Sequence, residues 1–168
     1  MAVPAGVAEA QIRIEYGGVV DLPEYAGSIS PNEATLTNDF WWPQIARGAA
    51  TYSAKVHAPK NWTVIAQGEQ VGVQDSATER VTTFRMTLPN SVFSLSAGPY
   101  RSGRKTIAGR EYRMLSTSTS EEDMAMQAEL NAPVIRFYEK TFGPYPFTSW
   151  TTLESRVYGG GALEAYSF

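Results

Sequence analysis

The sequence has 168 residues, of which 43% are hydrophobic, 12% aromatic and 18% charged. A chain of this length can bury a core, and its apolar and aromatic content excludes a disordered protein. The net charge of −3 argues against a nucleic-acid partner, and the absence of cysteine excludes a disulfide framework. No segment approaches the roughly 18 consecutive apolar residues of a transmembrane helix, so none is predicted.

The first 115 residues follow a β pattern. Apolar and polar side chains alternate with a period of two, and Gly, Pro or Asn residues separate the short runs. Many short strands at regular spacing are typical of an antiparallel β-sandwich. A hairpin turn is expected at Ala108–Gly109. The expected strands are residues 11–16, 36–42, 50–57, 62–67, 81–88, 91–97, 104–107 and 110–115.

The pattern changes after residue 115, where a Ser/Thr-rich run leads into a helical period. Ser120 can cap a helix whose first turn is acidic, and Gly143 can end it. Pro133 predicts a kink within this helix or two abutting helices. One more strand is expected over Thr148–Glu154.

Together these signals predict a mainly β chain in two parts. Residues 1–115 form a β-sandwich domain. Residues 116–168 form a linker, a helix and the first strands of an incomplete α+β domain.

A glycine run near the end of the sequence is the candidate binding motif. Gly159–Gly161 lets another backbone approach closely, so a peptide could add there as an extra strand. Glu164 follows, and its carboxylate could pair with the free ammonium group of that peptide. The alternative interpretation is a flexible loop with a solvated surface glutamate.

Two stretches carry a family resemblance. Residues 142–147, F-G-P-Y-P-F, and residues 161–165, G-A-L-E-A, resemble motifs of zinc aminopeptidases of the membrane-alanyl-aminopeptidase (gluzincin) type. In that family a helix, an F-G-x-Y-P-F stretch and a strand precede the G-[AG]-M-E-N exopeptidase motif. The similarity extends upstream to parts of the family's N-terminal β domain, namely Trp42–Pro43, Tyr52–Pro59 with Trp62, Ala66–Gly68, and Phe93–Gly98 with Tyr100.

The resemblance implies specific roles for the glycine-run segment. Glu164 is similar to the glutamate that binds the α-ammonium of the substrate, and Gly161 and Ala162 match the backbone edge along which the substrate lies. Leu163 stands where the motif has Met, and Ala165 stands where it has Asn, which removes a polar contact. The resemblance therefore predicts peptide N-termini as the substrate group.

The zinc-binding part of the family's site is absent from these 168 residues. The family's H-E-x-x-H motif lies downstream of the exopeptidase motif, whereas this sequence has one histidine, His57, and no cysteine. We therefore expect no catalytic residue and no metal ligand here, with zinc expected in a full-length parent protein. The chain is interpreted as the N-terminal portion of a zinc-dependent aminopeptidase-like metallopeptidase, inactive alone, whose partner is the remainder of its own catalytic domain.

One element of the family's site has no evident counterpart. The glutamine that the family's β domain contributes is not matched near Asn38–Pro43.

Two other interpretations stay open. The first is a β-sandwich protein- or carbohydrate-binding module, in which Trp41, Trp42, Tyr52 and Trp62 form an aromatic platform. The second is a glycosidase-like carboxylate pair formed by Glu154 and Glu164, which requires the two carboxyl groups to face each other across a cleft.

Overall fold

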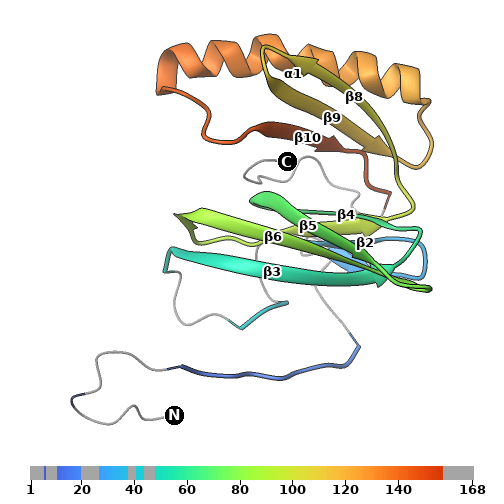
Figure 1. The fold of residues 1–168 in the computed structure, drawn as a ribbon, viewed down its shortest axis with the longest axis vertical. Helices are drawn as coiled ribbons and strands as arrows, with labels where there is room; N and C mark the ends of the chain where they lie inside the picture. Colours follow the sequence, from blue (N-terminus) through green and yellow to red (C-terminus); the bar gives the residue numbers. More distant parts are fainter. Residues whose placement is uncertain (1–5, 7–10, 20–26, 38–40, 44–47, 157–168) are drawn as a thin grey trace.

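The computed structural model describes residues 6, 11–19, 27–37, 41–43 and 48–156. Their fold is mainly β, with three sheets and one long helix (Figure 1). The elements are β1 Gly27–Ile29, β2 Ala34–Leu36, β3 Ala50–Pro59, β4 Thr63–Ala66, β5 Glu69–Asp75, β6 Glu79–Asn90, β7 Leu95–Gly98, β8 Arg101–Ile107, β9 Arg110–Ser116, α1 Glu121–Phe142 and β10 Ser149–Leu153.

Two antiparallel sheets form the predicted β-sandwich. The first sheet has the strand order β1-β2-β7-β4, and the second has the order β3-β6-β5. Strands from both sheets contribute to one apolar core, as expected when alternating side chains point inward. Its buried residues are Leu36, Ala58, Val64, Ala66, Phe84, Leu95 and Ala97.

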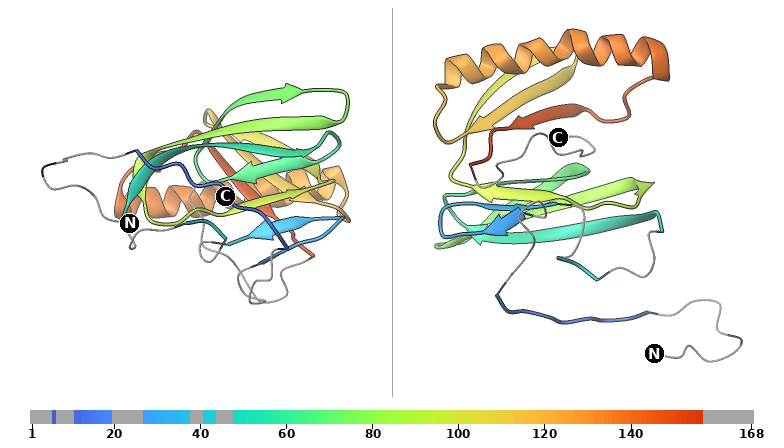
Figure 2. Two further views of the ribbon diagram at one scale, coloured as in Figure 1. Left: turned by 90° about the horizontal axis from the view of Figure 1, so that it is seen from below. Right: turned by 180° about the vertical axis from the view of Figure 1, so that it is seen from behind.

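The third sheet is mixed and has the order β10-β9-β8. β8 and β9 are antiparallel, whereas β10 lies parallel to β9 and is reached through α1. The helix covers one face of this sheet, and the sandwich lies on its other side (Figure 2). The core under the helix consists of Tyr112, Met114, Met124, Ala128, Ala132 and Ile135.

The predicted signals at the ends of α1 are confirmed. The Ser120 side chain accepts a hydrogen bond from the backbone N–H of Asp123, and the N–H of Gly143, at φ 95°, donates to the carbonyl of Glu139 at 3.1 Å. One continuous helix runs through Pro133, so the alternative of two abutting helices is wrong. Pro133 lies on the exposed side of the helix, where its ring is accommodated.

A single glycine sets how closely α1 approaches the third sheet. A Cβ atom on Gly103 of β8 would lie 2.3 Å from the backbone N of Ala125 and 2.5 Å from the carbonyl O of Glu121. Only a residue without a side chain permits this contact, so the helix backbone rests directly on β8.

A third apolar cluster joins the sandwich to the third sheet. Ile65 of β4, Tyr100 and Leu115 of β9 are buried together, and Leu153 of β10 packs against them. The first sheet thus shares one core with the second sheet and contacts the third sheet through Ile65, while α1 lies on the far side of the third sheet (Figure 1).

Some of the predicted strands are corrected by the structure. Residues 11–16 form no strand, and Ile12, Ile14 and Tyr16 are exposed. Their alternation has no neighbouring strand to pair with in the described chain. The strand expected over 36–42 ends at Leu36, and the one expected over 91–97 begins at Leu95.

Two strands, β1 and β5, were not predicted. β5 is an edge strand whose Val71 and Val73 are each 46% exposed. Its Glu, Gln, Gly and Asp residues conceal the β pattern.

The hairpin at Ala108–Gly109 is confirmed, and both residues have positive φ. Of its strands, β9 also pairs with β10, and among the described residues neither β8 nor β9 pairs with a strand of the sandwich sheets. The division into 1–115 and 116–168 stays a prediction, because sharing a sheet does not by itself define a domain.

Candidate functional site at the carboxyl ends of β9 and β10

The predicted substrate-binding residues Gly161, Ala162 and Glu164 lie outside the described residues, as does the rest of 157–168. The structure does describe Glu154–Arg156, the three residues that lead from β10 into that segment. Their contacts show where the segment begins.

Glu154 leaves the third sheet where the carboxyl ends of the parallel strands β9 and β10 meet. Its backbone N–H donates to the carbonyl of Leu115 at 2.9 Å. Its carboxylate accepts hydrogen bonds from the hydroxyls of Ser116, Ser118 at 3.4 Å, and Thr119 at 3.0 Å. The Ser116 hydroxyl, followed by that of Thr119, holds the pKa of Glu154 below its usual value. A charged carboxylate is thus fixed at this edge.

The next two residues contact the sandwich. The Ser155 hydroxyl lies 3.2 Å from the hydroxyl of Thr35 on β2, and the backbone N–H of Arg156 donates to Glu33 Oε2 at 3.2 Å. Residues Glu154–Arg156 are therefore held between the first and third sheets by side chains from both sides.

Glu33 is the buried carboxylate of this junction, with 3% of its surface exposed. Its Oε1 accepts a 2.6 Å hydrogen bond from the hydroxyl of Tyr100, and its Oε2 accepts from Arg156 N–H. Burial, followed by the Glu33 carboxylate, raises the pKa of Tyr100 well above its usual value. The phenol therefore stays protonated and serves as a donor.

The sequence analysis did not predict that Glu33 of the sandwich would take part in this junction. The family resemblance places such a residue near Asn38–Pro43, of which residues 38–40 lie outside the described chain. The available signal was a turn, because the Ser30 hydroxyl accepts from the backbone N–H of Asn32 and Glu33 at 3.2 and 3.1 Å. That turn places an acidic residue directly before β2.

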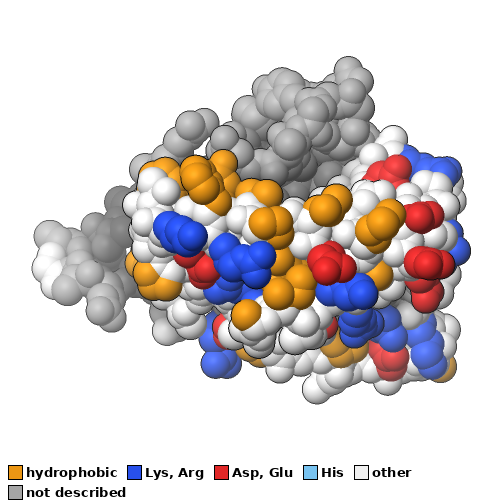
Figure 3. Space-filling view, turned by 90° about the horizontal axis from the view of Figure 1, so that it is seen from above, with side chains coloured by type: hydrophobic (Ala, Val, Ile, Leu, Met, Phe, Trp, Pro, Cys, Tyr) orange, Lys and Arg blue, Asp and Glu red, His pale blue; other side chains and the backbone are white. Residues whose placement is uncertain are grey.

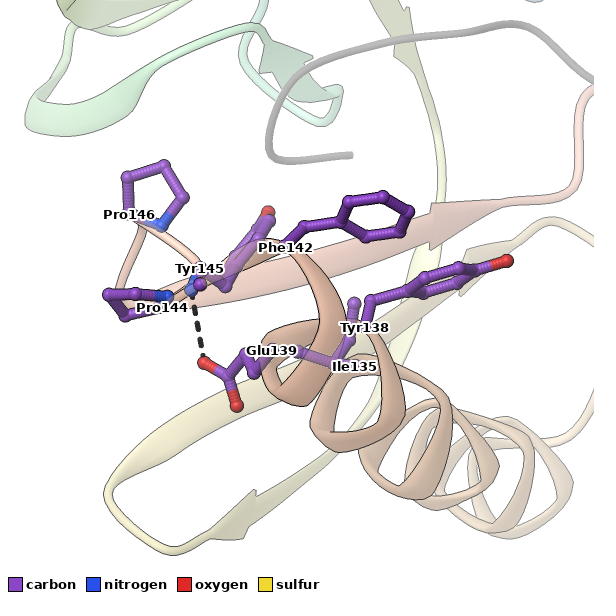
Figure 4. A pocket seen from close by; sticks show the side chains of 8 residues that line it. Ile135, Tyr138, Glu139, Phe142, Pro144, Tyr145 and Pro146 are labelled. Carbon is purple, nitrogen blue, oxygen red and sulfur yellow. Dashed lines mark hydrogen bonds between the residues drawn. The ribbon is translucent and has the colours of Figure 1, made fainter.

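The F-G-P-Y-P-F stretch returns the chain from α1 to β10. After Gly143 ends the helix, the backbone N–H of Tyr145 donates to Glu139 Oε1 at 3.1 Å, drawn as the dashed line in Figure 4. The same oxygen accepts from Arg110 Nη2 at 2.8 Å, and the Arg110 guanidinium lies 5.0 Å from the centre of the Tyr145 ring. These contacts lower the pKa of Glu139, with Arg110 the larger cause. They fix the entry into β10.

A pocket of about 230 Å³ lies at this end of the helix (Figure 4). It is bordered by aromatic and proline side chains, and its one carboxylate, that of Glu139, is already bound to Arg110. Its lining residues are Ile135, Tyr138, Glu139, Phe142, Gly143, Pro144, Tyr145 and Pro146.

The residues that the structure describes do not fit a zinc site. Among the described residues no three His, Cys, Asp or Glu side chains are grouped so as to hold a metal ion. His57 lies exposed on β3, where its Nδ1 is 3.2 Å from Glu79 Oε2. A zinc site takes at least three such ligands, so no step can be assigned to a metal held by these residues.

The aromatic residues proposed as a binding platform are packed around Phe93 instead. Ring centres of Trp41, Trp42 and Tyr52 lie 5.1, 6.5 and 4.8 Å from that of Phe93. Trp41, Trp62 and Phe93 also pack against the sandwich core. This arrangement stabilises the sandwich at one end.

Within the described part of the chain, no helix has the length and apolar character needed to cross a bilayer.

Comparison with known proteins gives a partial likeness of fold. No family model matches the chain, and no curated protein matches its sequence. Among solved structures, a two-domain M1 zinc metallopeptidase bound to L-arginine is similar over 62% of this chain and 26% of its own, with 18% identity and a TM-score of 0.49. An M1 zinc metallopeptidase from Deinococcus radiodurans has the same coverage and identity and a TM-score of 0.45.

The chain thus spans about a quarter of the length of the solved structures it resembles, since 26% of each is covered. Those proteins are zinc metallopeptidases, the class that the sequence motifs indicated. At 18% identity the likeness concerns part of the fold and assigns no activity to this chain.

Proposed function

We propose that these 168 residues are the β domain and the first part of the catalytic domain of a zinc-dependent aminopeptidase-like metallopeptidase. In this proposal Glu164 binds the N-terminal ammonium of a peptide, and Gly161 and Ala162 border the bound backbone. The zinc ligands and the general base are supplied by residues outside this sequence. The division at residues 115 and 116 belongs to the proposal, with β8 and β9 as the strands through which the two parts are joined.

One observation carries this proposal. The stretch Glu154–Arg156, which leads toward Gly159–Glu164, leaves the third sheet at the carboxyl ends of two parallel strands. There it contacts Thr35 of the first sheet and Glu33, the residue before β2. Ligands of sheets with parallel strands bind at such carboxyl ends, where loops from neighbouring elements converge. The motif resemblance of residues 142–147 and 161–165 supports the same assignment.

The junction gives the proposal a physical mechanism for specificity. Glu154 and Glu33 hold the two ends of a short stretch, Glu154–Arg156, so the residues that follow start from a fixed position. In the proposal, the Glu164 carboxylate, eight residues beyond this anchor, meets the ammonium of the substrate. Charge-assisted hydrogen bonds of that kind contribute roughly 1.5 to 3 kcal/mol.

The test is a Glu164→Ala substitution in an intact protein that includes the proposed zinc-binding region. We expect kcat/KM for peptides with a free N-terminus to fall about 10- to 200-fold, since each 1.4 kcal/mol is about tenfold. Zinc content and the melting temperature should stay unchanged, because the proposal assigns Glu164 to the substrate. Glu69→Ala, at an exposed glutamate of β5, is the matched control and should leave kcat/KM unchanged.

N-acetylated peptides complete the experiment. They lack the ammonium, so they should be poor substrates that are nearly insensitive to Glu164→Ala. An equal loss for free and acetylated peptides would refute the role of Glu164. An intact protein that binds no zinc and hydrolyses no aminoacyl substrate would refute the peptidase assignment and favour the β-sandwich binding module.

A further inference from the structure

Helix α1 has a second apolar face that the third sheet does not cover. Met126, Leu130, Val134 and Phe137 follow one another at intervals of four, four and three residues, which places them on one side of a helix. We call these four residues the outer stripe; their exposed fractions are 57, 65, 49 and 64%. The space-filling view from above shows hydrophobic side chains along this side of the helix (Figure 3).

The apolar surface is large for a monomer. Tyr138 and Phe142, which are 51 and 79% exposed, extend it toward the helix end. Six large side chains exposed to this extent present on the order of 600 Å², the upper end of what single-chain proteins leave uncovered. The four residues of the outer stripe account for on the order of 400 Å² of this surface. Two stripes pressed together therefore bury about 800 Å², which is typical of a weak interface.

The charges beside the outer stripe indicate what covers it. Glu122, Glu129, Arg136 and Lys140 lie along one flank, at intervals of seven, seven and four residues, and all four are exposed. Along the helix from its N-terminal end, the first two of these residues are acidic and the last two are basic. Within the described residues none of the four takes part in an ion pair.

The acidic half of this flank is complementary to the basic half of the same flank on a second, antiparallel copy. In an antiparallel pair of identical helices, the flank of one copy lies beside the same flank of the other. Glu122 then faces Lys140 and Glu129 faces Arg136, and the two-fold axis repeats both contacts. The helix dipoles also oppose each other favourably. In a parallel pair this flank would lie beside the opposite flank of the other copy, so these contacts would not form.

We propose that two copies of this chain associate through the outer stripes of α1 as an antiparallel, two-fold symmetric pair. In this arrangement Met126 packs against Phe137 and Leu130 against Val134 of the other copy. The interface is of the same-patch type that most homodimers use. A different protein would need the reversed charge order on a helix of its own, whereas a second copy provides it.

Sedimentation velocity of the 168-residue chain between about 1 and 200 μM tests the proposal. We expect a reversible monomer–dimer equilibrium with a dissociation constant on the order of 10 μM, given the modest area. Leu130→Glu and Phe137→Glu should each weaken it more than about tenfold, since a charge is placed in the interface centre. Circular dichroism should show an unchanged fold because both side chains are exposed.

A charge-reversal set tests the antiparallel geometry. Lys140→Glu alone places two like-charge contacts in the dimer and should weaken it about tenfold. Combining it with Glu122→Lys restores opposite charges and should bring the dissociation constant back to within about threefold. Lys55→Glu, at an exposed lysine of β3, makes the same charge change away from α1 and should have no effect.

The outcomes are distinct. A chain that stays monomeric at 200 μM, or a dimer that survives Leu130→Glu and Phe137→Glu, overturns the proposal. A dimer that the double reversal weakens further overturns the antiparallel arrangement.

Discussion

The hydroxyl of Tyr100 donates a 2.6 Å hydrogen bond to the carboxylate of Glu33, and the two residues are 6 and 3% exposed. Glu33 precedes β2 in the first sheet, whereas Tyr100 lies between the first and third sheets in an apolar cluster with Ile65 and Leu115. The pair therefore links the sandwich to the layer that carries the candidate site. Because Glu33 also accepts from Arg156 N–H, its position affects where the chain leaves β10.

Tyr100→Phe should destabilise the folded chain by about 1.5 to 3 kcal/mol, because a buried carboxylate loses a donor. Urea unfolding monitored by circular dichroism measures the change. The control is the same substitution in a Glu33→Gln background, where the acceptor is neutral and the cost should be smaller. Equal costs in the two backgrounds would show that the phenol acts through packing alone.

Gly103→Ala should be more damaging than an ordinary surface change. The added Cβ would lie 2.3 Å from the backbone of α1, so the helix must move away from β8. Overpacking of this kind costs about 1 to 3 kcal/mol or more. Gly72→Ala is the matched control, since a Cβ there would meet its nearest neighbour at 3.9 Å. If both substitutions have the same effect on the melting temperature, the close contact of helix and strand is wrong.

Local signals explain which elements could be predicted from the sequence. The helix was predicted because Ser120 and Gly143 mark its ends, and the β8–β9 hairpin because Ala108–Gly109 separates two alternating runs. The alternation of residues 11–16 led to a wrong strand prediction. Alternation with a period of two shows which face of a strand would be apolar, but it does not show that another strand is available for pairing.

The candidate site was less predictable because its contacts are distant in the sequence. Glu33 meets Tyr100 across 67 residues and Arg156 across 123. A buried acidic residue of this kind has no local pattern, and its role appears only when the first and third sheets are brought together. Glu154 was singled out as half of a carboxylate pair, whereas the structure shows its carboxylate bound by three hydroxyls of the β9–α1 connection.

Glu154 should make stability depend on acid pH. Its hydrogen bonds lower the pKa of the folded carboxyl below the ordinary value of 4.5. A lowered pKa contributes stability that is present above the unfolded-state pKa and is lost as the pH falls through the folded value. Glu154→Gln should therefore reduce stability at pH 6 and flatten its decline below pH 4.5. Parallel curves for the two proteins between pH 6 and 3 would contradict this role.

Tyr100 should produce the opposite dependence at alkaline pH. Burial and the Glu33 carboxylate raise the pKa of the folded phenol above the ordinary value of 10.0. A raised pKa contributes stability that is complete below the unfolded-state pKa and is lost as the pH rises toward the folded value. Above pH 10 an unfolded phenol releases its proton while the buried one keeps it. This single group then lowers the free energy of unfolding by about 1.4 kcal/mol per pH unit.

Urea unfolding at several pH values between 9 and 11 measures this slope. Tyr100→Phe should remove the contribution of one proton, about 1.4 kcal/mol per pH unit, from this slope. The free energy of unfolding of the variant should therefore decline less steeply above pH 10. Tyr52→Phe should act in the same direction, because burial also raises the pKa of Tyr52. If the slope of the Tyr100→Phe variant equals that of the unsubstituted chain, the phenol of Tyr100 ionises without unfolding. The buried contact with Glu33 would then not be the link between the two sheets.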